Sequence, residues 1–280
     1  MNGDARYAVL DLETRVNLAL AREVLHLGSE EPDAAVIKRL VEKRRSEGGG
    51  DFQKLPFHEP VAAAILLAER RGPAPDGPVI ATDWRLWRLG ELPLEQLVDR
   101  FFRNIAGRVY VGFNSQAFDL PLMELWASRC RVSAPEHFDR PSRPENPRYK
   151  YGEGHVDLQK ELVNWAWGSG TFDELCKFHG LPGKPGISGD EVESLVAAGR
   201  LDEVHAYNVT DVLQTQLLFL HVLLRAGKLT RAAAAESATS TLTLTREKVM
   251  SRLDEGGRAR ELLARTLDSC ARAPIAAAAD

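Results

Sequence analysis

The 280-residue sequence predicts an α/β domain, built as a mixed sheet flanked by helices, with a helical C-terminal extension. Two observations carry this prediction. Short apolar segments of strand length alternate with longer segments whose apolar residues recur at helical spacing. Strands come first and are then mixed with helices, which is the element order of an α/β domain. We expect this domain over residues 5–228 and an Ala-rich helical extension over residues 229–280.

The first strand is expected at residues 6–12. Ala8, Val9 and Leu10 are consecutive apolar residues, as in a strand that is covered on both faces. A helix with one apolar face follows at residues 33–45 and ends at a run of glycines.

Residues 61–68 are apolar and fit either a strand or a buried helix. Pro60 and a glycine-containing loop at residues 72–77 bracket the segment at strand length, which favours the strand. A second strand is expected at residues 79–86, and the two would form a hairpin.

The rest of the chain is expected to contain amphipathic helices and short strands joined by loops. In order, we expect a helix at 92–105, a strand at 108–113, a helix at 121–129, short elements at 155–158 and 172–178, and helices at 190–198 and 201–224. In the extension, helices are expected near residues 246–253 and 259–267, and the last ten residues are expected to fray.

Composition narrows the class of protein. The net charge is −4 and the pI is about 6.0. The chain as a whole is therefore not basic, which argues against a protein that coats nucleic acid. The three cysteines are widely spaced, which gives no zinc framework and fits a reducing compartment. The N-terminal residues do not resemble a signal peptide, and no apolar stretch approaches the ~20 residues of a membrane helix. We expect a soluble, cytoplasmic protein without a membrane partner.

Three short motifs carry candidate chemistry. In the first, Asp11 and Glu13 lie two residues apart in the expected first strand, so their side chains point to the same face. Two neighbouring carboxylates repel each other unless cations lie between them, and oxygen ligands of this kind suit magnesium or manganese. The alternative is a strand that runs into solvent, where acidic residues are common.

The second motif joins the strand at 108–113 to the helix that follows. Asn114 lies at the expected end of the strand, and Asp119 lies at the strand-to-helix junction before Pro121. Ligands gather at such junctions in α/β sheets. Asp119 could equally cap the helix without a role in binding.

The third motif lies in the long helix. Tyr207 and Asp211 are four residues apart and share one helical face, where a phenol could position a water while the carboxylate binds metal. The alternative is a half-buried tyrosine beside a surface acid. His205 lies about 240° around the helix from Asp211, so the tyrosine is the candidate water-positioning group.

These motifs, in this order, resemble those of DEDD-type exonucleases of the tyrosine subclass. The stretch Gly-Phe-Asn-Ser-Gln-Ala-Phe-Asp-Leu-Pro at 112–121 is especially similar to the proofreading domain of family B DNA polymerases. More closely, the chain resembles a stand-alone bacterial family of predicted 3′→5′ exonucleases related to that domain. Residues 52–60, 155–158 and 183–190 support the closer match, and the resemblance covers roughly residues 6–228.

The resemblance implies a ribonuclease H-like fold and a two-metal-ion exonuclease acting on 3′ ends of single-stranded nucleic acid, with DNA favoured over RNA. It implies that two divalent cations, Mg²⁺ or Mn²⁺, are bound by Asp11, Glu13, Asp119 and Asp211, and that Tyr207 orients the attacking water. Thr14 and Asn114 are further candidates for contacts with the terminal nucleotide.

Cations near the expected site offer contacts for phosphate. Lys184 lies in a Gly/Pro-rich loop and could neutralise a phosphate, or it could be an ordinary solvated lysine. A nucleic-acid strand could be guided by a basic patch formed by Arg140, Arg143, Arg148 and Lys150. The alternative is that these charges only keep the loop soluble.

Two other functions stay open at this stage. One is a nucleic-acid-binding module that keeps the fold without chemistry. The other is a metal-dependent phosphohydrolase that acts on small nucleotides. All four acids and the tyrosine are present, which favours a working exonuclease.

Overall fold

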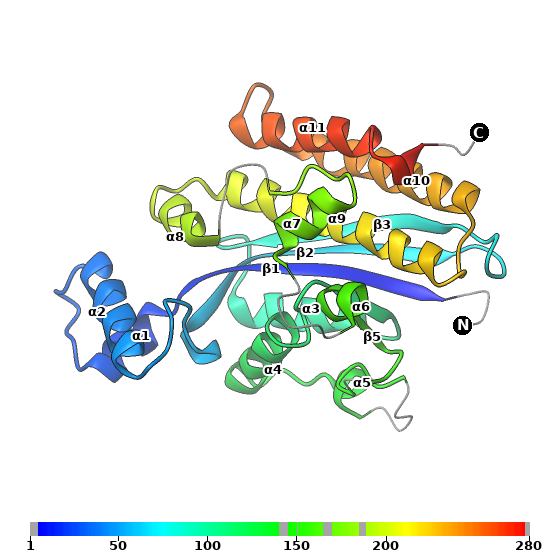
Figure 1. Cartoon of the computed structure of the whole chain (residues 1–280). Coiled ribbons are helices and arrows are strands. Elements are labelled where there is room, and N and C mark those ends of the chain that lie inside the picture. The colour runs from blue at the N-terminus through cyan, green and yellow to red at the C-terminus, as the bar shows by residue number, and fades with distance from the viewer. Residues whose placement is uncertain (1–4, 140–144, 150, 165–169, 185–188, 278–280) are drawn as a thin grey trace.

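The computed structural model describes residues 5–139, 145–149, 151–164, 170–184 and 189–277 (Figure 1). At its centre is a five-stranded sheet with the strand order β3-β2-β1-β4-β5. The strands are β1 (Arg6–Val16), β2 (His58–Arg70), β3 (Val79–Arg88), β4 (Val109–Gly112) and β5 (His155–Asp157). β1, β2 and β3 pair antiparallel, whereas β4 runs parallel to β1 and β5 runs parallel to β4. The sheet is therefore mixed, as the sequence predicts.

The alternation of side chains along β1 supplies both faces of the sheet with apolar groups. Tyr7 and Val9 join the hydrophobic cluster on one face, and Ala8 and Leu10 join the cluster on the other. All four are buried, which explains why their stretch of sequence is continuously apolar.

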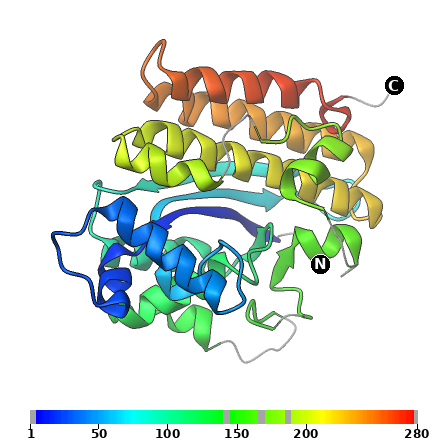
Figure 2. The ribbon, with the colours of Figure 1, turned by 60° about the vertical axis from the view of Figure 1, so that its left-hand side comes forward.

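Helices cover both faces of the sheet, and on one side α11 is stacked outside α9 and α10 (Figure 2). On one side lie α9 (Leu201–Arg225), α10 (Arg231–Lys248) and α11 (Arg258–Ala271), whose apolar residues share one cluster with β1, β2 and β3. On the other side lie α3 (Leu94–Ile105) and α4 (Asp119–Cys130). The C-terminal helices thus belong to the same core as the sheet.

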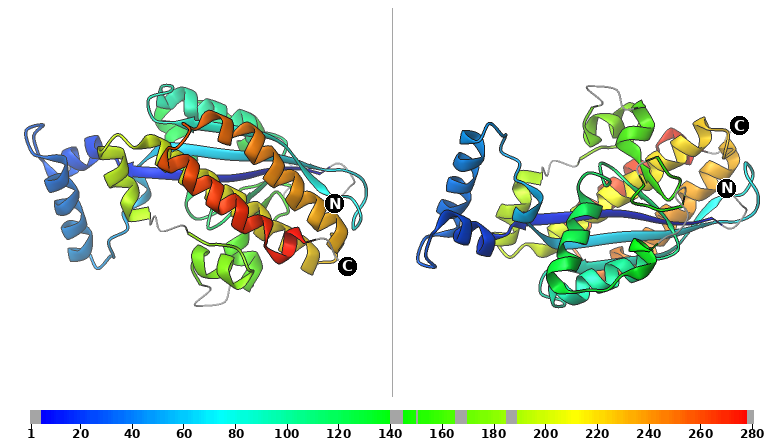
Figure 3. Two further views of the ribbon diagram at one scale, coloured as in Figure 1. Left: turned by 90° about the horizontal axis from the view of Figure 1, so that it is seen from above. Right: turned by 90° about the horizontal axis from the view of Figure 1, so that it is seen from below.

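A helical hairpin extends from the end of β1, at the left of Figure 3. It consists of α1 (Leu18–Leu25) and α2 (Asp33–Ser46), which pack through a small cluster centred on Ala21, Val36 and Leu40. The other described helices are η1 (Leu55–Phe57), α5 (Pro135–Phe138), α6 (Leu158–Val163), α7 (Phe172–Phe178), α8 (Gly189–Ala197), η2 (Met250–Arg252) and η3 (Pro274–Ala276).

Most expected elements are present, and the ambiguous segment at residues 61–68 is the strand β2. The prediction for residues 246–253 is wrong, because the helix there is α10, which begins at Arg231. Serine and threonine are poor helix formers when their hydroxyls compete for backbone groups. In α10 the hydroxyls of Ser237, Thr241 and Thr245 instead donate to carbonyls four residues earlier, which keeps them inside the helix.

The same helix runs along β3 and accepts hydrogen bonds from that strand. The backbone N–H of Val79 donates to Oγ of Ser237 at 2.8 Å, and the N–H of Ala81 donates to Oγ of Ser240 at 3.1 Å. The indole of Trp84 donates to Oγ1 of Thr245 at 3.2 Å. Hydroxyl groups of α10 thus accept from two backbone amides at the start of β3.

Among the helices of the described residues, none is long and apolar enough to cross a bilayer.

Candidate active site

The site forms where β1 continues beyond its parallel neighbour. β4 pairs with β1 only as far as Val9, so the following amides of β1 have no strand partner on that side. The N–H of Leu12 donates instead to Oδ1 of Asp119 at 3.0 Å. Asp119 begins α4 and comes from the helical layer opposite α9, so this bond ties the start of α4 to β1.

Three carboxylates meet beside this point. Asp11 and Glu13 lie on the face of β1 that looks toward α9, where they continue the series that starts with Tyr7 and Val9. Asp11, Glu13 and Asp211 each place one carboxylate oxygen within 4.8 Å of the other two. Glu13 and Asp211 are buried. The first and third sequence motifs are therefore adjacent in space.

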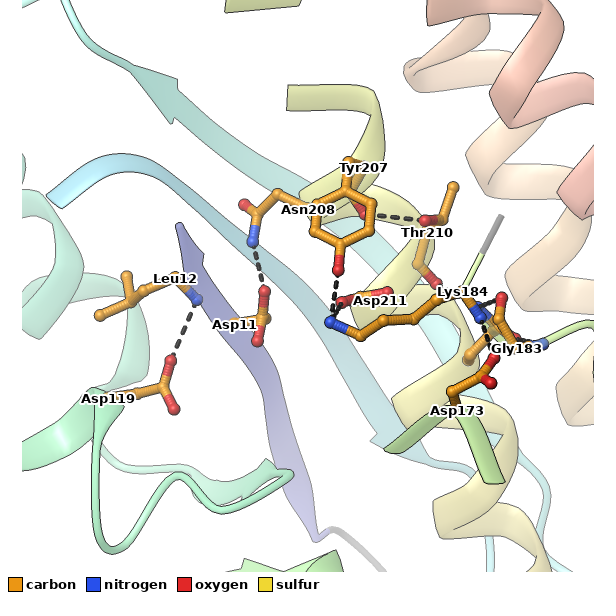
Figure 4. A network of polar contacts seen from close by, with 11 residues as sticks. Asp11, Leu12, Asp119, Asp173, Gly183, Lys184, Tyr207, Asn208, Thr210 and Asp211 are labelled. Carbon is orange, nitrogen blue, oxygen red and sulfur yellow. Dashed lines mark hydrogen bonds and ion pairs between the residues drawn. The ribbon is translucent and has the colours of Figure 1, made fainter. Parts of the chain in front are cut away.

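α9 supplies three polar side chains to the site. Tyr207 and Asp211 lie one turn apart on the same face, as their spacing predicts. Asn208, next to Tyr207, donates from Nδ2 to Oδ2 of Asp11 at 2.6 Å (Figure 4). His205 lies among other charged groups, namely Glu91, Arg88 and Arg252.

Lys184 enters the site from the loop between α7 and α8. Its Nζ donates to the hydroxyl of Tyr207 and lies 3.5 Å from Oδ2 of Asp211 (Figure 4). It is thus the cation that faces the carboxylate cluster, in keeping with its low side-chain exposure of 33 %.

Two neighbours fix the backbone that carries Lys184. Gly183 donates its N–H to Oε1 of Gln214 at 2.7 Å and accepts from Nε2 of the same side chain at 3.0 Å. The N–H of Lys184 donates to Oδ1 of Asp173 at 2.7 Å. Gly183 has a φ of 74°, and a Cβ there would lie 2.3 Å from Oδ1 of Asp173. Only glycine fits this position without a shift of the loop.

The turn before Asp119 is held by Asp157, at the end of β5. Its carboxylate accepts from the N–H of Asn114 at 2.9 Å and of Gln116 at 3.1 Å, and Lys160 lies 3.4 Å away. Asn114 has a φ of 57°, a left-handed conformation that asparagine tolerates better than most residues. Asp157 therefore positions the turn by accepting hydrogen bonds from the backbone amides of that turn.

Burial raises the pKa of all four acids. Desolvation is the largest cause for Asp119, whose pKa rises to about 7, and for Asp211, whose pKa rises to about 6 although Lys184 opposes the shift. The pKa values of Asp11 and Glu13 are also raised by burial, and then by neighbouring carboxylates. This cluster holds more negative charge than Lys184 alone compensates, which favours a bound cation.

The phenol of Tyr207 stays neutral. Burial raises its pKa above the ordinary value, and the charges of Asp211, Glu13 and Asp11 raise it further. Tyr207 can therefore orient a water by hydrogen bonding, but it cannot serve as a phenolate base near neutral pH.

The donor set fits a hard divalent cation. All the clustered ligands are carboxylate oxygens, the type that Mg²⁺ and Mn²⁺ prefer. Oδ1 of Asp211 is buried and has no hydrogen-bond partner among the described residues. A buried carboxylate oxygen without a donor is costly, and a cation would satisfy it. Asp119 does not belong to this set of three and is bound to Leu12, but its charge acts strongly on Asp11.

The remaining candidates lie around the cluster. Oγ1 of Thr14 contacts Nδ1 of His58 at 3.0 Å, and Asn114 lies in the turn held by Asp157. Arg148 is paired with Glu124, whereas Arg140, Arg143 and Lys150 lie outside the described residues. Trp84 and Trp87 are buried in the core, and Trp165 and Trp167 are not among the described residues.

Sequence reasoning missed the residues that position the charged groups. Asn208, Gln214 and Asp173 carry no motif of their own, although two of them lie on the same helix as Tyr207 and Asp211. Asn208 is one residue from the tyrosine and Gln214 is three residues from the acid. Polar residues in an otherwise buried helix are the signal that could have identified them.

Comparison with known proteins assigns the family. A family model described as "Predicted 3'-5' exonuclease related to the exonuclease domain of PolB" matches residues 50–255. The match includes Asp119, Lys184, Tyr207 and Asp211, whereas Asp11 and Glu13 precede it. No curated protein matches the chain. Since the matched residues make up well over half of the sequence, and the mixed sheet with flanking helices is consistent with a ribonuclease H-like fold, the chain belongs to this predicted 3′–5′ exonuclease family.

Proposed function

We propose that the protein is a metal-dependent 3′→5′ exonuclease that hydrolyses phosphodiester bonds from the 3′ end of single-stranded nucleic acid and releases nucleoside 5′-monophosphates. The observation that carries this proposal is the meeting of Asp11, Glu13 and Asp211 within 4.8 Å, in a member of a predicted exonuclease family. The relation of the family to the exonuclease domain of PolB favours DNA, with RNA as the alternative substrate.

Two divalent cations, Mg²⁺ or Mn²⁺, would be held by Asp11, Glu13, Asp119 and Asp211. Such a pair activates a water and neutralises the charge that develops on the leaving oxygen. The buried, unpartnered oxygen of Asp211 and the raised pKa values of the four acids support cation binding here.

The other side chains would handle the substrate. Tyr207 orients the attacking water through its neutral hydroxyl, and Lys184, whose Nζ faces that hydroxyl, neutralises a phosphate oxygen. Thr14 and Asn114 contact the terminal nucleotide from the strand end and from the turn held by Asp157.

The direct test uses single-stranded DNA and RNA oligonucleotides labelled at the 5′ end, incubated with Mg²⁺ or Mn²⁺. Stepwise shortening of the labelled strand and release of nucleoside 5′-monophosphates are expected. Asp211→Ala should abolish shortening while leaving the fold intact. The matched control is Asp268→Ala, since Asp268 is an exposed acid on α11 that pairs with Arg246 on the surface.

Three results would contradict the proposal or its ligand assignment. Retention of the oligonucleotide without shortening would indicate a binding module of the same fold. Hydrolysis of small nucleotides alone would indicate a phosphohydrolase. Near-normal turnover by Asp211→Ala would show that the ligand assignment is wrong.

A further inference from the structure

An exposed aromatic group lies outside the hydrophobic core, on the loop between α2 and η1. Phe52 is 67 % exposed, yet its ring centroid lies 4.8 Å from that of His58 and 5.4 Å from that of Phe118. His58 and Phe118 also contact each other, with centroids 5.0 Å apart and rings at 90°. We call Phe52, His58 and Phe118 the aromatic triad. Phe52 is its outer member.

The triad adjoins the carboxylate site on two sides. Phe118 directly precedes Asp119, so their Cα atoms are ~3.8 Å apart. Thr14 directly follows Glu13, and its hydroxyl contacts Nδ1 of His58 at 3.0 Å. The triad is therefore connected to the residues next to Glu13 and Asp119, one through a hydrogen bond and one through the chain.

The support beneath Phe52 is rigid. Nε2 of His58 contacts the carbonyl of Gln53 at 3.2 Å, and the carbonyl of His58 accepts from the indole of Trp126 at 2.9 Å. His58 is thus held at both ring nitrogens and at its backbone. An aromatic ring that rests on a fixed base and keeps one side open has little conformational freedom to lose when a planar ligand binds.

The uncharged aromatic surface of the triad suits a nucleobase better than a phosphate. The side chains of the aromatic triad carry no formal charge with His58 neutral, so they offer a phosphate no ion pair. Planar nucleobases stack on such rings whatever their identity, because every base presents a π face. A nucleobase is therefore the part of a nucleic-acid strand that this surface suits.

We propose that Phe52, supported by His58 and Phe118, is a stacking platform for a nucleobase of the strand whose 3′ end lies at the carboxylate site. This inference rests on the proposed function, and it adds a substrate-binding residue that recognises bases without reading their sequence. It predicts that the protein prefers polymers that carry bases over the same phosphodiester backbone without them.

The test compares Phe52→Ala, Phe52→Trp and wild type on two oligonucleotides, one normal and one with abasic residues at its 3′ end. Stacking on one aromatic side chain accounts for ~1–3 kcal/mol per base, so Phe52→Ala should raise KM on the normal strand by about tenfold or more. It should leave KM on the abasic strand unchanged. Phe52→Trp should retain tight binding, because a larger ring also stacks.

Phe178→Ala is the matched control, since Phe178 is 83 % exposed on α7 and is not part of the triad. It should behave as wild type on both strands. Binding of fluorescently labelled normal and abasic strands is measured in parallel, so that the platform is tested even without turnover.

The outcomes separate the two ideas. If the wild type degrades DNA and Phe52→Ala has the same KM on the normal strand, the platform is wrong and the exonuclease stands. If no variant degrades any strand but Phe52→Ala still weakens binding of the normal strand alone, the platform stands and the exonuclease is wrong. Equal binding of normal and abasic strands by the wild type would also overturn the platform.

Discussion

Asn208 on α9 donates from Nδ2 to Oδ2 of Asp11 on β1, over 2.6 Å. Asn208 is fully buried, whereas Asp11 is partly exposed, so this bond lies at the border between the core and the site. One oxygen of Asp11 is thereby fixed relative to the helix that carries Asp211. The bond sets the geometry of the carboxylate cluster, since it ties together the two elements that contribute its acids.

Replacing Asn208 by leucine should therefore weaken cation binding without unfolding the protein. Loss of a group that orients a metal ligand typically costs ~10–100-fold in metal affinity or activity. We expect Asn208→Leu to need a correspondingly higher Mn²⁺ concentration for half-maximal activity. Gln216→Leu is the control, because Gln216 is equally buried on α9 and its amide has no hydrogen-bond partner among the described residues. Equal metal requirements for both variants would refute the positioning role.

Gly183→Ala should displace Lys184 from the site. The new Cβ would lie 2.3 Å from Oδ1 of Asp173, and the backbone would keep a left-handed φ that costs ~1–2 kcal/mol for other residues. We expect a lower melting temperature and a marked loss of activity per folded molecule. Gly199→Ala separates the two effects, because its φ is 70° but, chain neighbours aside, no atom of the described residues lies within 4 Å of the added Cβ. That control should lose stability only, and an equal loss of activity there would rule out the clash as the cause.

Without divalent cations, the stability of the fold should fall as the pH rises, and divalent cations should offset this loss. Folding raises the pKa of Asp119 to about 7 and of Asp211 to about 6, and it raises those of Asp11 and Glu13. Groups with a raised folded-state pKa stabilise the fold below their unfolded pKa, and this contribution is lost as pH rises through the folded pKa. In a chelator, the free energy of unfolding should fall between about pH 4 and pH 7 or above.

Mn²⁺ should offset this loss, because it binds the ionised acids of the folded state. The measurement is the melting temperature at pH 5 and pH 8, with and without Mn²⁺. The increase caused by Mn²⁺ should be larger at pH 8. An increase that is equal or larger at pH 5 would contradict the assignment of these acids as ligands.

Asp157→Ala should destabilise the turn that leads to Asp119. The variant leaves the partly buried amides of Asn114 and Gln116 without their charged acceptor, and a hydrogen bond to a charged group contributes ~1.5–3 kcal/mol. Urea unfolding should show a loss of ~2 kcal/mol or more, together with lower activity. Asp268→Ala should change the free energy of unfolding by ~1 kcal/mol or less, since its ion pair is exposed. A loss for Asp157→Ala as small as that of the control would show that the turn does not need this acid.

The carboxylates were predictable because each lies in a local pattern. Asp11 and Glu13 alternate within a strand, and Tyr207 and Asp211 share a helical face, so their directions follow from backbone geometry alone. The acids and the tyrosine also fit a known order of motifs. Their individual roles stay predictions until variants are measured.

The positioning contacts were not predictable in the same way. Asn208 and Asp11 form a hydrogen bond although they are 197 positions apart in the sequence. The local sequence around either residue does not predict this contact. The position of Lys184 depends on Gln214 and Asp173, which lie on different elements. Such contacts follow from tertiary packing, which periodicity within one segment does not report.

The fold was predictable wherever apolar periodicity was strong. The prediction failed for α10, because the hydroxyl-rich sequence of that helix shows little apolar periodicity. The side chains of α10 bond instead to carbonyls of the same helix and to β3. The same sequence is equally compatible with a loop in which those hydroxyls bond to nearby backbone groups. Contact with the sheet decides between the two.

The hydroxyl groups of α10 along β3 also bear on how molecules meet one another. An outer strand with free amides is a template for a strand from a second molecule, and such edge-to-edge joining leads to aggregation. Ser237 and Ser240 occupy two such amides at the start of β3, and the opposite outer strand, β5, has only three residues. A chain that stopped at residue 228 would lose this cover, so the C-terminal helices guard the protein against self-association as well as completing its core.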